Sequence, residues 1–182
     1  DAYGVVAGDA DYDPVCDIGP TDDATASGIP VTDDRIDFED LVILGLNFGA
    51  VSGEKSVPVV DEPVQLAWVT APDGQQALHL LAGSGLQGLR LRAALPEEAT
   101  VTVSPGELLA DRPDHTLQNV GSGLDASLVM LGAGRGIQRT GELLVVDSQV
   151  NLAPGDLEVD ARDAANQPLV VALTGSTGSQ PP

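Results

Sequence analysis

Basic, aromatic and sulfur-containing residues are all scarce in this 182-residue chain. Only 8 Lys and Arg stand against 28 Asp and Glu, so the formal net charge is −20. Nucleic-acid binding needs clustered basic residues that neutralise phosphates, and this composition therefore predicts no nucleic-acid partner. Anionic membrane surfaces are disfavoured for the same reason. A metal cation is the partner that the charge favours, although acidity can also serve solubility alone.

The single cysteine, Cys16, excludes an intrachain disulfide bond, so the fold must be stabilised by its core or by metal. We interpret Cys16 as a small buried apolar residue. No stretch reaches the ~20 apolar residues of a transmembrane helix, and we expect no membrane insertion. The chain begins at Asp1, as a processed protein or a fragment would. We expect a secreted protein that lies outside the cell or on its surface.

Histidine is also scarce, and neither of the two in the chain indicates catalysis. His79 falls in an alternating strand pattern, and His115 falls in a predicted loop. No Gly-x-Ser-x-Gly sequence marks a nucleophilic serine. The glycine-rich stretch 132–136 lacks the lysine and the following helix of a phosphate-binding loop, so we interpret it as a turn. Aromatic residues make up 3% of the chain and are too scattered for a sugar-binding platform. We therefore predict that the protein is not an enzyme.

The second part of the chain has the pattern of a β protein. Gly and Pro are plentiful, at 21 and 13 residues, and they separate short apolar runs in which apolar and polar residues alternate. Many short strands with frequent turns predict a mainly β fold, a β-sandwich or jelly roll. The eight predicted strands are Val64–Ala71, Ala77–Ala82, Gly88–Ala94, Thr100–Val103, Ser127–Leu131, Glu142–Val150, Leu157–Ala161 and Leu169–Leu173.

One short helix is predicted in the first part, between Asp37 and Phe48. Asp37 is placed to cap its first turn, and acidic residues in that turn suit the positive end of the helix dipole. Gly49 is a ready stop at its other end. The helix is apolar on almost all sides, so we expect it to pack against something.

Acidic residues gather at the start of the chain, since residues 1–60 carry 13 acidic and 2 basic residues. The sequence Gly8-Asp9-x-Asp11-x-Asp13 places carboxylates at alternate positions, as the first half of a calcium loop does. The expected second half comes only after about twenty further residues. There Ile36 fits the apolar position of such a loop, and Asp40 fits its last carboxylate at the start of the helix.

We therefore interpret residues 8–41 as one calcium loop split by an insertion. Oxygen donors alone favour calcium over zinc. The firmest predicted ligands are Asp9, Asp11, Asp13 and Asp40, while Asp17, Asp33 and Asp37 compete for the remaining positions. A carbonyl of Cys16 or Arg35 is a candidate neutral donor. Asp22 and Asp23 also lie within the insertion and are candidate ligands for a second ion.

These residues resemble the dockerin family. A dockerin repeat opens Gly-Asp-x-Asn/Asp-x-Asp-Gly and closes x-Ile/Val-x-x-x-Asp-Leu before a helix. Gly8-Asp9-x-Asp11-x-Asp13 matches the opening, Ile36-x-x-x-Asp40-Leu41 matches the closing, and Leu41–Phe48 matches the helix. This chain differs by its long insertion and by having one repeat where dockerins normally have two.

The second part is similar to the cohesins, the sandwich domains that dockerins bind. The likeness rests on the strand count and on three runs, which are 78–83, 89–96 and 141–146. Together the two resemblances imply a calcium-ordered structural protein that associates head to tail with copies of itself, as a filament or surface layer. The alternative is an attachment module that binds another cohesin-type or dockerin-type protein or a polysaccharide-degrading complex. The two hypotheses differ in self-association, because an assembly protein polymerises alone and an attachment module stays monomeric until it meets a partner. A carbohydrate-binding sandwich is a third hypothesis.

The expected organisation has four parts. Residues 1–50 form the dockerin-like calcium-binding segment with its helix, and residues 51–63 form a linker. Residues 64–175 form the cohesin-like sandwich, and residues 176–182 form a tail.

Overall fold

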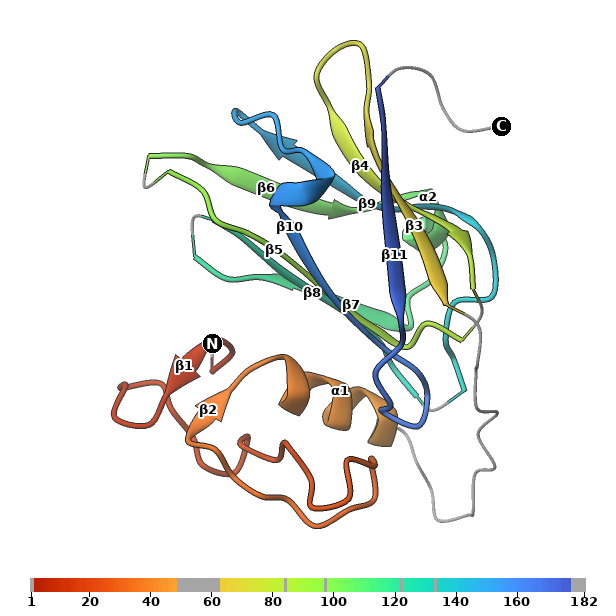
Figure 1. The fold of residues 1–182 in the computed structure, drawn as a ribbon. Helices are drawn as coiled ribbons and strands as arrows, with labels where there is room; N and C mark the ends of the chain where they lie inside the picture. The colour runs from red at the N-terminus through yellow and green to blue at the C-terminus, as the bar shows by residue number, and fades with distance from the viewer. Residues whose placement is uncertain are drawn as a thin grey trace.

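The computed structural model describes residues 2–48, 63–83, 85–96, 98–121, 123–132 and 134–177. Its main body is a β-sandwich of two facing sheets (Figure 1). One sheet has five strands in the order β11-β3-β4-β9-β6, and the other has four in the order β10-β5-β8-β7. The prediction of a mainly β fold built on a sandwich is confirmed.

The strands of the two sheets are joined almost entirely by antiparallel pairing, with β11 beside β3 as the one parallel pair among the described strands. The five-stranded sheet contains β3 (Val64–Thr70), β4 (Gln76–Ala82), β6 (Val101–Pro105), β9 (Gly141–Ser148) and β11 (Val171–Thr177). The four-stranded sheet contains β5 (Gly88–Ala93), β7 (His115–Asn119), β8 (Leu124–Met130) and β10 (Leu157–Arg162).

Every strand predicted from alternation is present, with ends that move by a few residues. The strand β7 was missed, and His115, expected in a loop, is its first residue. β7 has only one large apolar residue, Leu117, so its alternation is weak, and pairing with β8 makes it a strand. β11 reaches Thr177, two residues into the stretch expected as a tail.

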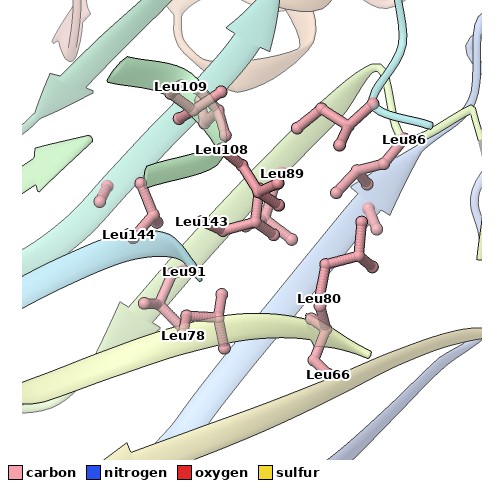
Figure 2. Packing of buried hydrophobic residues seen from close by; sticks show 14 of the residues in the cluster. Leu66, Leu78, Leu80, Leu86, Leu89, Leu91, Leu108, Leu109, Leu143 and Leu144 are labelled. Carbon is pink, nitrogen blue, oxygen red and sulfur yellow. The ribbon is translucent and has the colours of Figure 1, made fainter. Parts of the chain in front are cut away.

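Leucine side chains from both sheets fill the space between them (Figure 2). In β5, Leu89 and Leu91 point into this core while Arg90 and Arg92 point away from it, because side chains alternate along a strand. Trp68 of β3 is almost fully buried, and its indole N–H donates to the carbonyl of Leu152 at 2.9 Å. The sandwich core is therefore complete without residues from the N-terminal part of the chain.

Helices are few and short. The predicted one is α1 (Phe38–Asn47), and Asp37 caps it as expected by accepting a hydrogen bond from the backbone N–H of Glu39 at 3.1 Å. The other helices described are α2 (Glu107–Ala110) and the 3₁₀ turn η1 (Pro154–Asp156). No helix of the described residues is long and apolar enough to span a membrane. Gly49 and the predicted linker up to residue 62 lie outside the described residues.

Candidate functional site

Residues 2–48, called the acidic segment below, lie on the outer face of the four-stranded sheet. Figure 1 shows this segment in red and orange beside β5 and β8, on the side away from β3 and β4. A two-stranded ribbon of β1 (Val5–Val6) and β2 (Arg35–Ile36) joins the start of this segment to the residues just before α1. The ribbon continues as Ala7 N–H donates to the carbonyl of Asp34 at 2.8 Å. The residues just before the opening half of the predicted split motif are thus paired with residues 34–36 of its closing half.

Several of the predicted calcium ligands close local turns through their carboxylates. Asp9 accepts a hydrogen bond from Val6 N–H at 3.0 Å, and Asp13 accepts one from Val15 N–H at 3.0 Å. Asp33 accepts one from Arg35 N–H at 3.1 Å. These are the bonds with which aspartates stabilise turns. Asp9, Asp11, Asp13 and Asp33 are exposed to solvent.

Asp17 is the buried carboxylate of the insertion, with 2% of its surface exposed. Its side chain accepts a hydrogen bond of 2.6 Å from the Tyr12 hydroxyl and a longer one of 3.4 Å from Asp33 N–H. The bond to Asp17 raises the pKa of Tyr12 to about 12, because the carboxylate favours the neutral phenol. The structure therefore brings Asp17 and Asp33 together.

Asp40 joins the insertion to the helix. One carboxylate oxygen accepts hydrogen bonds from the backbone N–H groups of Ile18 at 2.6 Å and Gly19 at 2.8 Å. The other accepts from Asp37 N–H at 2.7 Å, which completes a capping box. Burial raises the pKa of Asp40, and the three backbone donors oppose that rise. Asp40 and Asp37 are thus adjacent, and Asp40 satisfies three backbone donors that would otherwise lack partners.

The chemistry of these residues fits a hard cation, since every predicted donor is an oxygen. Over the ranges that the structure describes, however, no three Asp, Glu, His or Cys side chains gather as a group that could hold a metal ion. The calcium ligand set therefore stays a prediction. The interpretation of Cys16 as a buried residue is wrong, because Cys16 is exposed on a turn where its backbone N–H donates to the carbonyl of Asp13.

An apolar contact holds α1 on the outer face of the sandwich. Phe38, Val42 and Leu46 lie one turn apart along the helix and are at least 98% buried. They form a cluster with Val129 of β8 and with Ala164, separate from the core between the sheets. At Gly88 of β5, a Cβ would lie 3.0 Å from the side chain of Val42, so the helix approaches the sheet where the sheet lacks a side chain.

Arginines of the sheet meet acidic residues of the segment around this contact. Arg90 makes a bidentate pair with Asp125 at 2.7 and 2.8 Å, and its guanidinium also lies 3.8 Å from Asp37 at the helix cap. Asp125 raises the pKa of Arg90, so the guanidinium stays charged. Arg162 of β10 lies 3.5 Å from Glu39, whose pKa is raised by burial.

Hydrogen bonds also join the acidic segment to the sandwich. The Tyr3 hydroxyl donates to Ser127 Oγ of β8 at 2.6 Å, and burial raises the pKa of Tyr3. Gly132 N–H donates to the carbonyl of Gly45 at 2.7 Å. The side chain of Asn166, between β10 and β11, donates to the carbonyl of Ala24 in the insertion at 3.3 Å. The acidic segment is thus bound by strands and loops that are far apart in the sequence.

The residues of this contact were not predicted as functional. A signal existed for the arginines, because the chain has few cations and the alternation of β5 places Arg90 and Arg92 on the outer face. No sequence signal marked Val129 or Gly88 as the docking position of the helix. The apolar helix was expected to pack against something, and α1 packs on the four-stranded sheet of its own sandwich.

Comparisons with known proteins give a likeness of fold. No protein-family model matches the chain, and no curated protein matches it. Among solved structures, a non-cellulosomal cohesin from the hyperthermophilic archaeon Archaeoglobus fulgidus is 18% identical over 65% of this chain and 91% of that one, with a TM-score of 0.42. The third cohesin of ScaC from Acetivibrio cellulolyticus, solved in complex with the ScaB dockerin, is 14% identical over 63% of this chain and 96% of that one, with a TM-score of 0.46. At these scores the likeness carries no functional assignment, and the sandwich described above rests on its own strand order.

Proposed function

We propose that this protein is a non-catalytic, extracellular protein–protein interaction module. The observation that carries the proposal is the contact between the acidic segment and the four-stranded sheet. It has an apolar centre at Val42 and Val129 and charged pairs such as Arg162–Glu39 beside it. Specific protein interfaces have this anatomy, with an apolar core and a polar rim. The chain therefore carries a recognition surface and an element that fits it.

Calcium orders the acidic segment in this proposal. The support is the oxygen-only donor set, the pattern of Asp9, Asp11 and Asp13, and the β1–β2 ribbon that pairs the residues just before this pattern with Arg35 and Ile36. Extracellular calcium saturates sites with dissociation constants of about 10⁻⁴–10⁻³ M, so even a weak site would be filled there. An ion that binds only the folded segment stabilises it by mass action.

Attachment to a second protein is the leading form of this function. The resemblance of residues 8–49 to a dockerin repeat, and of the sandwich to a cohesin, implies a dockerin-type or cohesin-type partner. Self-association into a filament or surface layer is the second candidate. One observation favours it, namely that one chain holds both the helix and the face on which the helix packs, as a head-to-tail contact requires.

Sedimentation velocity of the full chain, in calcium and after chelation, separates these forms. Large assemblies in calcium that dissolve on chelation support self-association. A monomer that binds a purified dockerin or cohesin domain in calcium supports attachment. A monomer that binds no member of a panel of such domains under either condition contradicts the proposed function.

A further inference from the structure

We infer that the outer face of β5 and β8 is a receptor for the acidic segment of a second copy of this chain, so that two copies can exchange residues 2–48. The inference rests on the proposed interaction function and names the contact through which copies would associate. The face and the segment already fit each other within one chain.

The contact is separable from the sandwich core. Val129 belongs to the cluster under the helix, whereas its neighbours Leu128 and Met130 belong to the core between the sheets. Successive residues of β8 thus serve different interfaces, because their side chains point to opposite faces. Loss of the segment uncovers an apolar position on the sheet without opening the core, which is the property of a docking face.

Charge favours an acidic partner at this face, although Arg90 and Arg162 also pair with Asp125 and Asp160 of the sheet itself. Arg90 and Arg162 are two of only eight basic residues in the chain, and both are largely buried beneath the segment, with 17% of each side chain exposed. Each meets a carboxylate of the helix start, Asp37 or Glu39. In a chain of net charge −20, the same acidic helix start in a second copy is the complementary partner that the molecule itself supplies.

The length of chain between the two parts permits the exchange. Phe48 ends the described segment and Pro63 precedes β3. A chain of that length spans at most about 50 Å when fully extended, which exceeds the roughly 30 Å diameter of a small domain. The segment can therefore reach the face of a neighbouring copy, and exchange of an identical element is a low-cost route to oligomers.

Two full-length variants with complementary defects test the inference. Val42→Asp places a charge on the helix side of the contact and leaves the face intact, whereas Val129→Asp places a charge on the face and leaves the segment intact. Each variant alone is expected to remain monomeric. When they are mixed in calcium, the intact segment of one is expected to dock on the intact face of the other, giving a complex of one copy each.

Native mass spectrometry and sedimentation velocity of the mixture measure that complex. We expect the mixed pair to associate more than about tenfold more strongly than either variant with itself. Val170→Asp is the matched control, since Val170 is 72% exposed, and a chain that carries it keeps its own segment. The fluorescence of Trp68, the single tryptophan, reports whether each sandwich is folded. Val42→Thr and Val129→Thr form a second pair that is nearly isosteric, for use if the aspartate variants fail to fold.

Absence of a mixed complex in both pairs, with Trp68 buried in every variant, overturns the inference. A complex of equal strength in the Val170→Asp mixture also overturns it, because association would then not depend on the vacated face. The assembly state of the wild-type chain tests the proposed function separately. If the wild type assembles but the two variants form no mixed complex, the proposed function stands and this face is rejected as the receptor. If the variants form a mixed complex but the wild type is monomeric and binds no dockerin or cohesin domain, the face stands and the proposed function is rejected.

Discussion

Gly45 of α1 lies against Val129 of β8 so closely that a Cβ on the glycine would overlap the valine side chain. The same Cβ would lie 3.2 Å from the carbonyl oxygen of Met130. Glycine in a helix interior costs about 1 kcal/mol relative to alanine. The close approach of helix and sheet offsets that cost, because it buries the whole inner face of α1.

In Gly45→Ala, a gain in helix propensity opposes the cost of adding a Cβ where the helix lies close to the sheet. Propensity alone predicts a gain of about 1 kcal/mol, whereas overpacking a tight contact costs about 1–3 kcal/mol. We expect a net loss, with faster hydrogen exchange of the α1 amides and unchanged exchange in β3 and β4. Gly155→Ala is the control, since a Cβ there meets nothing within 4 Å. Slower exchange in α1 of Gly45→Ala would show that the helix does not depend on this contact.

Arg90 and Arg92 give a matched test of the charged contacts, because they are two residues apart on the outer face of β5. Arg90 is largely buried between Asp125 and Asp37, whereas Arg92 pairs with Glu158 at 2.8 Å in an exposed position. Arg90→Gln removes the 3.8 Å ion pair with Asp37 together with the hydrogen bonds to Asp125 of the sheet. We expect a total loss of stability of about 1.5–3 kcal/mol, the value of hydrogen bonds to charged groups, with a part of that loss in the docking of the acidic segment. Arg92→Gln is expected to change stability by at most about 1 kcal/mol.

Proteolysis of the acidic segment measures both arginine variants, since cleavage follows the population of the undocked form. The wild type and Arg92→Gln should resist cleavage equally, and Arg90→Gln should be cleaved faster within residues 2–48. Equal rates in both variants would mean that Arg90 does not hold the segment.

The sandwich was predictable because its signal is local. Alternation in β5 and β10 shows which residues face inward, and glycine-containing turns separate the strands. The helix was predictable for the same reason, since Asp37 and Asp40 are cap residues next to an apolar run. By contrast, β7 has a single large apolar residue, and it becomes a strand only through its pairing with β8.

The docking of the helix was not predictable, because it joins residues that are far apart in the chain. Nothing in the local sequence pairs Val42 with Val129 or Asp37 with Arg90. The aspartate pattern has a different limit. A carboxylate at alternate positions suits both an ion and a turn, and Asp9 accepts the N–H of Val6 in this structure. The pattern alone therefore does not distinguish a calcium ligand from an aspartate that stabilises a turn.

Removal of one predicted ligand tests the calcium hypothesis directly. Asp11→Ala is expected to weaken calcium binding by at least about tenfold and to leave the sandwich folded, because Asp11 is exposed and remote from the core. Asp73→Ala is the control, since it removes an exposed aspartate from the turn after β3. Isothermal titration calorimetry of the full chain measures both. Unchanged calcium affinity in both Asp11→Ala and Asp40→Ala would reject the split loop.

The Tyr12–Asp17 hydrogen bond predicts how the acidic segment responds to alkaline pH. The pKa of Tyr12 is raised from about 10 to about 12 in the folded chain. A raised folded pKa means that the bond contributes its full stability below about pH 10 and loses it as pH rises toward 12. Asp17→Asn should return the pKa of Tyr12 toward 10, because the carboxylate is the largest cause of the rise.

Ultraviolet absorbance of tyrosinate measures this pKa, and the difference between the wild type and Tyr12→Phe isolates Tyr12 from Tyr3, the other tyrosine. The same titration decides whether Asp17 is a calcium ligand. An ion on the Asp17 carboxylate would offset its negative charge, so calcium should lower the pKa of Tyr12 in the wild type. A wild-type Tyr12 that titrates near pH 10 without calcium would contradict the hydrogen bond. A pKa near 12 that calcium leaves unchanged would keep the bond and remove Asp17 from the ligand set.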